Sequence, residues 1–416
     1  MKIAVIGTGI SGLSAAYLLQ QQHDITVFEQ ADRIGGHTAT MEVGLNGRDY
    51  QIDTGFIVFN DWTYPNFIRL MDELGVASQP TEMSFSVSCE NSGLEYGGNN
   101  LNTLFAQRCN LFSPSYLKMI KDILRFNKEA VEDLENNRIK ETTTLGEYLA
   151  ANHYGKTFAN KYLIPMGSAI WSASTESMFN FPVLFFVRFF KNHGLLSVNN
   201  RPQWRVIKGG SSAYIDPLTE SFKERIRLNT GVEKITRHDN GVEISLADGS
   251  VEQYDQVVIA SHSDQALGML ADASDQEVSV LSAMPYQDND VILHTDDSVL
   301  PDKKLAWSSW NYWLRSEQQE RAILTYNMNI LQGIDAPETF CVTLNATDAI
   351  DPTKIIGRYN YSHPVFSLAS VAATERWQEI NGVNNTWFCG AYWANGFHED
   401  GVVSGIRVAK ALGAKW

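Results

Sequence analysis

The sequence predicts an α/β protein in which a Rossmann-type dinucleotide-binding domain is assembled from separate chain segments and accompanied by an α+β domain. Residues 1–80 open with a buried strand, a glycine turn, a helix and a second strand, a pattern typical of a βαβ unit. Strand and helix patterns of the same character return at 205–275 and 380–416. The intervening segments, 81–204 and 276–379, differ in texture, and 416 residues exceed the usual size of one core. We therefore expect two domains, the second of which holds the substrate.

Hydrophobic periodicity and turn residues place the individual elements. In the first segment, strands are expected at 2–6 and 24–28, a helix at 11–22, and another helix at 66–74 that ends at Gly75. The later elements that the patterns predict are helices at 116–136, 144–152, 214–225 and 401–412, strands at 231–236, 242–246, 256–260 and 386–390, and mixed strands between 280 and 375.

The glycine turn after the first predicted strand, Gly-Thr-Gly-Ile-Ser-Gly, predicts a site for the phosphates of a dinucleotide. Gly7 permits the tight turn, Gly9 lets a pyrophosphate approach the backbone, and Gly12 lets the helix pack closely on the strand. Free N–H groups at the helix start, at Ile10 and Ser11, then hold the phosphates. Glycines also serve ordinary turns, and the strand–turn–helix–strand context is what favours the phosphate site.

Two further features select the dinucleotide. Glu29 lies about twenty residues beyond Gly9, where a carboxylate accepts hydrogen bonds from ribose hydroxyls and disfavours a 2′-phosphate. Arg33, Gly35 and Gly36 form a second glycine loop that can surround the far part of a bulky dinucleotide, which points to FAD rather than to a nicotinamide. A solvated surface charge is the alternative interpretation of the arginine. Because no cysteine lies in a recognised flavin-linkage motif, we expect the FAD to be non-covalent.

Composition excludes several classes of function. The 48 acidic and 33 basic residues give a net charge of −15, which argues against a nucleic-acid binder. The four cysteines lie far apart, so neither a metal site nor a disulfide framework is expected. Apolar residues begin at Ile3 and leave no room for a leader peptide, which predicts a cytoplasmic protein. The stretch Phe179–Phe190 is too short to span a bilayer; it is either a core helix, an acyl tunnel wall or a peripheral contact with the inner membrane face.

Several stretches carry a resemblance to a known family. They are Ile52-Asp53-Thr54-Gly55 and the TYPNFIRLMDELG stretch after it, WRVIKGG at 204–210, Thr230-Gly231-Val232, and CGAYWANGFHEDGVVSGIRVAKAL at 389–412. With the opening motifs, they make the chain resemble the flavin-dependent amine oxidase and phytoene desaturase superfamily, which has the glutathione-reductase-like FAD fold. The resemblance implies an FAD-binding domain formed by 1–80, 205–275 and 380–416. It also implies that the last helix points its N-terminus at the flavin pyrimidine, where the dipole stabilises negative charge.

The resemblance carries the cofactor contacts over residue by residue. The residues that it places at FAD are Gly7, Gly9, Ile10, Ser11, Gly12, Glu29, Gln30, Arg33, Gly35, Gly36, His37, Thr54, Gly55, Val232, Gly390, Asp400, Gly401 and Val402. Ser404, Gly405 and Ala409 are expected to serve helix packing instead.

Departures from the family pattern bear on the substrate. Phe397 stands where amine oxidases usually have a tyrosine that forms one wall of an aromatic amine cage, and Ala391 replaces the acid of the Gly-Glu element. No lysine matches the one that often contacts flavin N5 through water. His37 and the GFHEDG element are more similar to a bacterial branch of the superfamily that modifies lipids. Members of that branch are thought to desaturate methylated unsaturated fatty acyl chains on the way to furan fatty acids, so the resemblance implies a lipid or fatty acyl substrate.

Residues at the start of the last helix are the candidates for catalysis. His398 and Glu399 can handle protons beside the flavin, because histidine titrates near neutrality and a carboxylate tunes it. Hydrogen bonds that hold the loop to a helix start are the alternative role. The residues expected to line the substrate are Tyr392, Asn395, Phe397, Trp310 and Tyr312. Such aromatic rings also fill cores.

Three other functions compete with a lipid desaturase. The first is an amine oxidase. The second is a sugar-nucleotide mutase that uses reduced flavin, which requires an arginine cluster for a diphosphate that this sequence lacks. The third is a non-catalytic flavin-fold protein that binds a lipid or a partner. The intact phosphate loop, Glu29, the Arg-Gly-Gly element and the last helix argue against the third.

Overall fold

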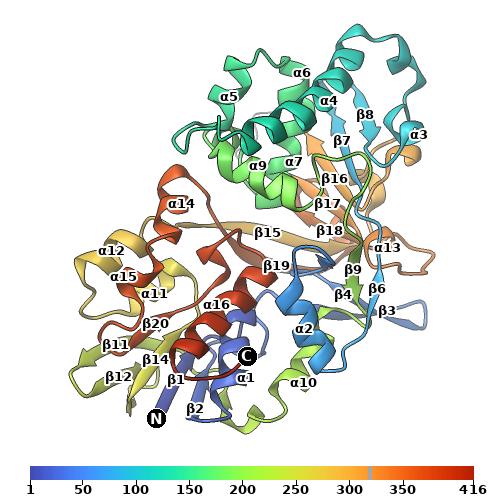
Figure 1. Ribbon diagram of the computed structural model, residues 1–416. Helices are drawn as coiled ribbons and strands as arrows, with labels where there is room; N and C mark the ends of the chain where they lie inside the picture. The colour runs from blue at the N-terminus through green and yellow to red at the C-terminus, as the bar shows by residue number, and fades with distance from the viewer. Residues whose placement is uncertain (317–320) are drawn as a thin grey trace.

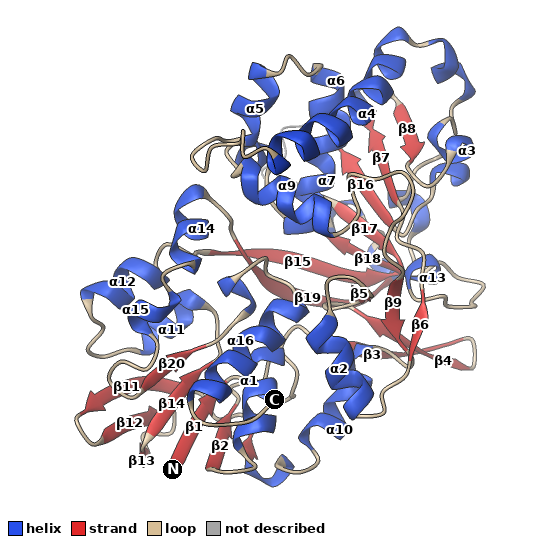
Figure 2. Cartoon of the chain, in the orientation of Figure 1, coloured by secondary structure: helices blue, strands red, loops and turns tan. Residues whose placement is uncertain are grey.

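The computed structural model describes residues 1–316 and 321–416. In Figure 1 the lower unit contains both termini and a parallel sheet, and the upper unit is a group of helices at the opposite end of the molecule. A seven-stranded sheet runs from the middle of the molecule up beneath these helices, as Figure 2 shows. The molecule therefore has two layered units that meet at the large sheet.

The lower unit is built on a five-stranded parallel sheet. Its strands, in spatial order, are β10 (Ile226–Arg227), β2 (Asp24–Phe28), β1 (Lys2–Ile6), β14 (Gln256–Ile259) and β20 (Thr386–Phe388). Every neighbouring pair is parallel, and Val5 of β1 pairs with Val27 on one side and with Val258 on the other. The strands come from three segments far apart in the sequence. The predicted α/β fold with a segmented Rossmann-type sheet is confirmed.

Both faces of this sheet are buried, which explains the continuous apolar character of its strands. One face packs on the helices α1 (Ile10–Leu19), α2 (Pro65–Glu73), α10 (Ile215–Thr219) and α16 (His398–Ala411). The other face packs on β11 (Val232–His238), β12 (Gly241–Leu246) and β13 (Val251–Tyr254), which form an antiparallel sheet, and on α11 (Ser263–Met269) and α12 (Asp275–Leu281). Ile3 and Val5 face the first layer and Ala4 and Ile6 the second, as the two-residue period of a strand requires.

Some predicted helix ends differ from the structure. The helix predicted at 214–225 stops at Thr219, because Phe222 leaves the helical path and buries its ring in the core beneath the parallel sheet. The helix predicted at 401–412 begins earlier, at His398, because the Asp400 carboxylate accepts a hydrogen bond from the N–H of Phe397 and so caps the helix there. The helix predicted at 11–22 ends at Leu19.

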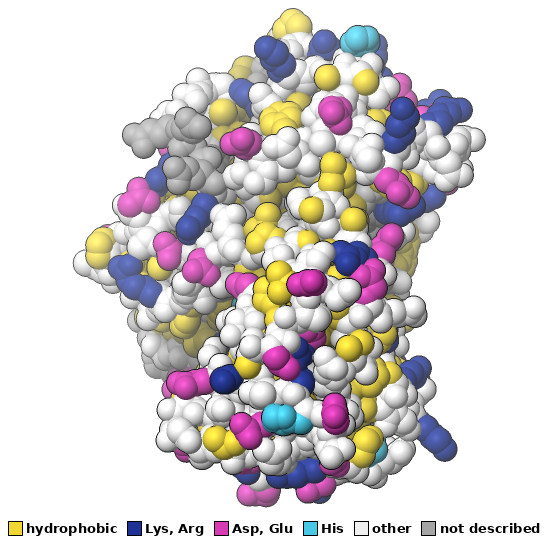
Figure 3. Space-filling model, turned by 90° about the vertical axis from the view of Figure 1, so that its left-hand side faces the viewer, with side chains coloured by type: hydrophobic (Ala, Val, Ile, Leu, Met, Phe, Trp, Pro, Cys, Tyr) yellow, Lys and Arg dark blue, Asp and Glu magenta, His cyan; other side chains and the backbone are white. Residues whose placement is uncertain are grey.

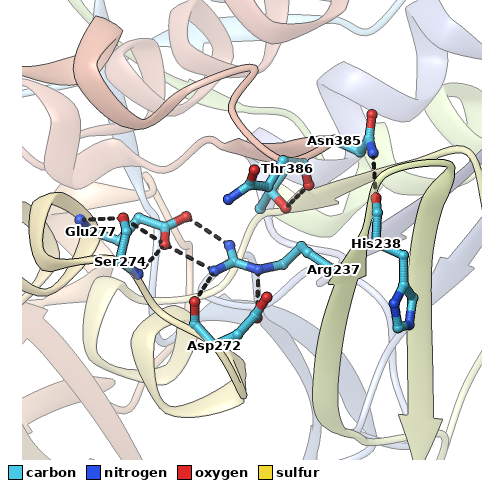
Figure 4. Close-up of polar contacts among 8 residues, drawn as sticks. Arg237, His238, Asp272, Ser274, Glu277, Asn385 and Thr386 are labelled. Atoms are coloured by element: carbon cyan, nitrogen blue, oxygen red, sulfur yellow. Dashed lines mark hydrogen bonds and ion pairs between the residues drawn. The ribbon is translucent and has the colours of Figure 1, made fainter.

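A buried ion pair ties the antiparallel sheet to α12 (Figure 4). Arg237 of β11 donates from Nη1 to Glu277 Oε1 at 2.7 Å and from Nη2 to Glu277 Oε2 at 3.0 Å. Its Nε donates to Asp272 Oδ1 at 2.7 Å. The side chains of Arg237 and Glu277 are only 2% and 1% exposed. The pair therefore has the bidentate, fully bonded geometry that a buried charge requires.

The large sheet joins the two units. Its strands, in spatial order, are β19 (Ile355–Pro364), β15 (Tyr286–His294), β18 (Cys341–Leu344), β17 (Leu324–Asn327), β16 (Trp310–Leu314), β7 (Phe85–Cys89) and β8 (Leu94–Gly97). All of its pairings are antiparallel except that of β16 with β7. Two small sheets consist of β3 (Thr40–Leu45) with β4 (Arg48–Asp53), and of β5 (Val58–Asn60), β9 (Trp204–Ile207) and β6 (Ser78–Pro80).

The upper unit buries its own core against β7, β8, β16 and β17. Its helices are α3 (Leu101–Leu104), α4 (Pro114–Glu135), α5 (Leu145–Ala151), α6 (Lys156–Phe158), α7 (Ile164–Trp171), α8 (Thr175–Phe179) and α9 (Val183–Asn192). Within the stretch Phe179–Phe190, the rings of Phe181, Phe186 and Phe190 are at most 1% exposed, so this stretch belongs to the core. Among residues 1–316 and 321–416, no helix is both long enough and apolar enough to cross a bilayer.

Candidate functional site

The carboxyl edge of the parallel sheet gathers the sequence motifs at one place. Because its strands are parallel, the loops that follow β1, β2, β14 and β20 all leave from this edge, and they include the glycine turn, Glu29 and Gly390. Both α1 and α16 begin at this edge. Their first turns are in contact, because a Cβ added to Gly401 in α16 would lie 2.7 Å from Ile10, the first residue of α1. Ligands of open α/β sheets bind outside this edge.

Gly7 and Gly12 are required by close packing. Gly7 has a φ of +105°, which disfavours any side chain, and an added Cβ would lie 3.0 Å from the carbonyl oxygen of Ala260. A Cβ added to Gly12 would overlap the carbonyl oxygen of Gly7 and lie 3.0 Å from Cβ of Ala260. These two glycines therefore let β1, α1 and the loop after β14 meet backbone to backbone.

Gly9 faces open space instead. An added Cβ would meet no atom within 4 Å, and its φ of −65° suits any residue. No side chain caps α1, so the N–H groups of Ile10 and Ser11 at the helix start are available to an anion. Gly36, with a φ of +58°, lies so close that its added Cβ would be 3.1 Å from Gly9 Cα. The two glycine loops thus present bare backbone side by side, which fits the pyrophosphate of a dinucleotide.

The carboxylate of Glu29 is held in place at the end of β2. Its Oε2 accepts hydrogen bonds from Thr8 N at 3.0 Å and Thr8 Oγ1 at 2.5 Å, and its Oε1 accepts one from the N–H two residues further on. Oε1 accepts only that one bond and keeps a free lone pair, so a ribose hydroxyl can still donate to it. The N–H of Thr230 donates to the Glu29 carbonyl oxygen at 2.8 Å. This bond holds the segment that contains Val232 at the end of β2, where the exposed Gln30 also lies.

Arg33 orders the second glycine loop. Its Nη1 donates to the carbonyl oxygen of Thr38 at 3.0 Å, and its Nη2 donates to that of Gly36 at 2.7 Å. A Cβ added to Gly55 would overlap the carbonyl oxygen of His37, so the Asp-Thr-Gly element packs directly on this loop. The arginine therefore acts on the loop conformation, and the solvated-charge interpretation does not describe it.

Most of the predicted cofactor residues come together around the two glycine loops. They are Gly7, Gly9, Ile10, Ser11, Gly12, Glu29, Gln30, Arg33, Gly35, Gly36, His37, Gly55, Val232 and Gly390. The side chain of Val402 is fully buried in the core, and Gly401 packs on α1. The hydroxyl of Thr54 is hydrogen-bonded to Tyr361 Oη of β19 at 2.9 Å.

Asp400 fixes the loop that precedes α16. Its Oδ2 accepts hydrogen bonds from Phe397 N at 2.9 Å and Asn395 N at 3.2 Å, and its Oδ1 accepts one from Asn395 Nδ2. Burial raises the pKa of this carboxyl to about 6. Ser404 and Gly405 serve packing: Ser404 Oγ accepts from Gly390 N at 3.0 Å, and a Cβ on Gly405 would overlap α1 backbone. The position of Phe397 is therefore set by α16 itself.

His398 and Glu399 do not meet as a proton-handling pair. The ring of His398 is buried and stacks on Phe56 with 3.4 Å between centroids. Its Nε2 lies 3.0 Å from Thr38 Oγ1 and 3.3 Å from Tyr214 Oη. Burial holds the pKa of this imidazole well below its usual value, so the ring is neutral near pH 7. The expected pairing is therefore wrong, because the two side chains leave α16 in different directions.

Glu399 instead caps α2. Its Oε1 accepts hydrogen bonds from Asn66 N at 3.1 Å and Asn66 Nδ2 at 2.7 Å, and its Oε2 accepts one from Phe67 N at 2.8 Å. The N-cap residue of α2, Tyr64, supplies no side-chain bond. A carboxylate from another helix therefore satisfies N–H groups that have no partner inside α2. These contacts support the alternative role for Glu399, although the helix start that it bonds is that of α2.

Replacing Glu399 by glutamine is expected to lower stability rather than to stop chemistry. A neutral amide accepts these N–H groups less strongly and turns a donor toward them, so the free energy of unfolding should fall by about 1–3 kcal/mol. The rate of flavin reduction by substrate should stay within about tenfold of wild type. Loss of a general base would instead cost about 100-fold to 10,000-fold. Chemical denaturation and stopped-flow absorbance give the two values, and a rate loss of that larger size with unchanged stability would restore the catalytic role.

A histidine cluster lies where the lower unit meets the large sheet. The centroid of the His37 ring is 5.8 Å from that of His262 and 5.7 Å from that of His363. His262 stacks on Tyr286 with 4.1 Å between centroids, and His363 Nδ1 lies 2.9 Å from Ser172 Oγ. Sequence patterns could not group His262 and His363 with His37, because the three residues are more than sixty positions apart. In the described part of the chain, no group of three or more His, Cys, Asp and Glu side chains could hold a metal ion.

The histidine cluster predicts a loss of stability in mild acid. Burial lowers the pKa of His37 and His262 to about 4 and that of His363 to about 3, from an ordinary value of 6.5. Below about pH 6.5 the unfolded chain takes up protons that the folded chain excludes, so the free energy of unfolding falls as the pH is lowered. His363→Gln should remove about 1–2 kcal/mol of the loss between pH 7 and pH 5, at about 1.4 kcal/mol per pKa unit. Guanidinium unfolding curves at both pH values test this, with exposed His238→Gln as the control; equal pH dependence in His363→Gln and wild type would refute it.

A cavity of about 450 Å³ opens beside the start of α16. The residues that line it are Trp62, Thr63, Tyr64, Pro65, Phe189, Asn192, His193, Asn395, Phe397, Glu399 and Asp400. Two of the predicted substrate-lining residues, Asn395 and Phe397, are among them. Tyr392 and Tyr312 are not, because they lie in the cores of the two units with 1% and 2% exposure, and Trp310 packs between two cores.

One wall of this cavity continues into a run of aromatic rings. Phe397 stacks on Phe189 with 5.2 Å between centroids, and Phe189 lies 4.8 Å from Trp171. Trp171 in turn contacts Phe181 at 4.6 Å. We call the set Phe397, Phe189, Trp171, Phe181, Phe185 and Phe366 the aromatic wall. It links the start of α16 to the core of the upper unit.

Comparison with known proteins, by sequence and by structure, finds a matching family and similar proteins. The family model described as flavin containing amine oxidoreductase matches residues 10–326. A putative flavin-containing monoamine oxidase of Mycobacterium tuberculosis is 26% identical over 268 residues, which cover 60% of this chain and 54% of that protein. This chain thus spans about half the length of that relative.

A zeta-carotene desaturase of Capsicum annuum is 32% identical over 98 residues, 23% of this chain and 16% of that protein. Among solved structures, a CLA-producing fatty acid isomerase from P. acnes has the same fold, with a TM-score of 0.70 at 17% identity over 99% of this chain and 98% of that one.

Proposed function

The chain belongs to the flavin-containing amine oxidoreductase family, and on that premise we propose that it is an FAD-dependent oxidoreductase that desaturates a methylated, unsaturated fatty acyl chain of a lipid. Family membership implies FAD as the cofactor. The bare glycine loops, the uncapped start of α1 and Glu29 fit the pyrophosphate and ribose of that cofactor. When bound, FAD supplies a hydride acceptor whose electrons pass on to oxygen or another acceptor.

The aromatic wall is the observation that carries the proposed substrate. Its rings Phe397 and Phe189 line the cavity, and its other rings pack in the core of the upper unit. Pockets for small molecules are lined mainly by such apolar and aromatic side chains, with few polar groups to fix orientation. Asn395 and His193 supply polar groups at the cavity end of the wall. An acyl chain that enters the cavity would bury apolar surface against Phe189 and Phe397.

The carboxylates of the cavity do not suit a free ammonium group. Glu399 is engaged by three donors at the start of α2, and Asp400 by three donors of the loop before α16. Phe397 has no hydroxyl to complete an amine cage. The groups that would bind a cation are therefore committed to the fold, which favours an uncharged substrate.

His398 is the chain's candidate for handling the proton that desaturation releases. Burial lowers the pKa of its imidazole, which is therefore neutral and a weaker base than usual, and its Nε2 lies within hydrogen-bond distance of Thr38 Oγ1 and Tyr214 Oη. A neutral imidazole has one nitrogen that can accept a proton. Thr38 follows the second glycine loop, so His398 is positioned by the same segment that fits the cofactor.

Fatty-acid analysis of cells with and without this protein tests the proposal. Cells that lack it should accumulate a methylated monounsaturated acyl chain and lose a product two hydrogens poorer. Restoring the wild-type chain should reverse both changes, and restoring Gly9→Ala, which keeps the fold but weakens FAD binding about 10-fold to 100-fold, should reverse them less completely. Identical acyl profiles in all four strains would reject a lipid substrate.

Amine oxidation is the second candidate. The observation that favours it is the 268-residue match to a flavin-containing monoamine oxidase. Two carboxylates, those of Glu399 and Asp400, also lie in the cavity lining, where they would attract a cation if their present donors moved away. Amines therefore belong in any test of substrates.

A further inference from the structure

The outer face of the upper unit exposes an unusual number of large apolar side chains. Among the described residues, five of the fourteen exposed large hydrophobic side chains fall between positions 101 and 124. They are Leu101, Leu111, Phe112, Leu117 and Leu124. Phe112 is 87% exposed and Leu101 is 74% exposed. Large apolar side chains exposed this close together in the sequence indicate an interaction site.

The same stretch carries a net positive charge, although the chain as a whole is negative. Residues 96–128 contain five basic side chains and one acidic side chain, a net charge of +4 in a chain whose net charge is −15. The basic residues are Arg108, Lys118, Lys121, Arg125 and Lys128. The acid, Asp122, is 5% exposed and accepts a hydrogen bond from Gly155 N, so it adds no exposed negative charge. Arg125 and Lys128 pair with Glu129 and Glu132 further along α4, so the basic side chains of this stretch without an acidic partner, in the described chain, are Arg108, Lys118 and Lys121.

Helix geometry places these two kinds of side chain on one face. Along α4 the exposed positions 117, 121, 124 and 128 are spaced by four, three and four residues, and they alternate leucine and lysine. The opposite side of α4 is buried in the core of the upper unit through Tyr116, Met119, Phe126 and Ala130. Figure 1 places α3 and α4 in the upper unit, at the end of the molecule farthest from the termini. Figure 3, which shows the side that is on the left in Figure 1, has hydrophobic side chains and Lys or Arg side chains near the top of the molecule.

We infer that this face, formed by α3, residues 108–112 and the first half of α4, docks on a lipid bilayer that contains anionic headgroups. Lysine stems can lie along the apolar surface while their ammonium groups reach the headgroups, and Phe112 and the leucines enter the acyl boundary. Charge complementarity selects an anionic partner. The negative charge of the rest of the chain opposes a nucleic acid, whose phosphates would extend beyond this small face.

The docking face is one helix away from the aromatic wall. α4 packs on α9, which carries Phe185 and Phe189, and Lys191 of α9 pairs with Glu135 of α4 at 2.8 Å. A bilayer on the outer side of α4 would hold acyl chains close to the proposed substrate site. The docking inference rests on exposed side chains and charge alone, so it stands whether or not the proposed substrate is right.

Vesicle co-sedimentation of the full-length, FAD-loaded protein tests the inference. Vesicles of equal parts phosphatidylcholine and phosphatidylglycerol should bind the protein, and vesicles of phosphatidylcholine alone should bind it at least about tenfold more weakly. Phe112→Ser should weaken binding about tenfold, through lost apolar burial. Lys118→Gln with Lys121→Gln should weaken it about tenfold and reduce its salt dependence.

Matched changes elsewhere on the surface provide the control. Lys234→Gln with Val278→Ser removes one exposed lysine and one exposed apolar side chain from the lower unit and should leave binding unchanged. Flavin absorbance and thermal melting confirm that each variant is folded. Equal binding to both vesicle types, or binding that the docking-face variants leave intact, overturns the inference. Self-association that Phe112→Ser abolishes, without vesicle binding, would make a second copy the occupant and overturns it too. No readout here requires turnover, so a wrong substrate cannot produce these failures.

Discussion

Replacing Gly9 by alanine is expected to weaken FAD binding about 10-fold to 100-fold while the protein stays folded. The added methyl group would point into open space, where no atom of the chain lies within 4 Å, and the backbone angles at Gly9 suit alanine. That space is where the pyrophosphate must approach the N–H groups of Ile10 and Ser11. Losing one charge-assisted hydrogen bond costs about 1.5–3 kcal/mol, and each 1.4 kcal/mol is tenfold in affinity.

The matched change at Gly12 separates packing from binding. A methyl group there would overlap the carbonyl oxygen of Gly7, so Gly12→Ala should lower the free energy of unfolding by about 1–3 kcal/mol, as overpacked sites do. The free energy of unfolding of the Gly9→Ala apoprotein should stay within about 0.5 kcal/mol of that of the wild-type apoprotein. FAD titration by fluorescence quenching and denaturation of the apoproteins give both values. Full affinity in Gly9→Ala would mean that the cofactor phosphates lie elsewhere.

Replacing Arg237 by alanine is expected to destabilise the protein by about 3–5 kcal/mol, because it leaves the Glu277 carboxylate charged and buried without a partner. The guanidinium bonds both oxygens of Glu277 and one of Asp272, and its side chain is 2% exposed. This network joins β11 to α12 on one face of the parallel sheet (Figure 4). Loss of the network should therefore also raise hydrogen exchange in the β11–β12 hairpin.

A double replacement tests the origin of that cost. Arg237→Met with Glu277→Leu removes both charges and keeps apolar volume, so it should recover most of the lost stability. Denaturant unfolding of the two variants gives the comparison. If the double variant is no more stable than Arg237→Ala, the loss comes from packing around the arginine rather than from an unpaired carboxylate.

Local signals accounted for the dinucleotide-binding core. The strands β1 and β2 begin and end where the apolar runs 2–6 and 24–28 do, because each run is short and flanked by polar residues or glycine. The roles of Gly7, Gly9 and Gly12 could be assigned from spacing alone, since they depend on backbone contacts within one strand–turn–helix unit. Motif reasoning therefore placed the strand–turn–helix unit and its glycines more accurately than it placed contacts between distant segments.

Long-range contacts were beyond the reach of those signals. Glu399 bonds the start of α2 across more than 300 residues, and His363 joins His37 across a similar distance, so no local period or spacing connects them. Aromatic residues raise a second difficulty, because the same ring suits a core or a pocket. Tyr392 and Tyr312 were expected to line the substrate, yet both rings point into the hydrophobic cores of their units. Only the packed structure shows which face of an element meets the cavity.

The most direct test of the account is an anaerobic titration of the FAD-loaded protein with candidate substrates, followed by flavin absorbance. A lipid with a methylated, unsaturated acyl chain should bleach the flavin band, and the recovered lipid should have lost two hydrogens. Simple primary amines and polyamines should leave the band unchanged. Bleaching by amines, with no response to the lipid, would contradict the proposed function and make the protein an amine oxidase.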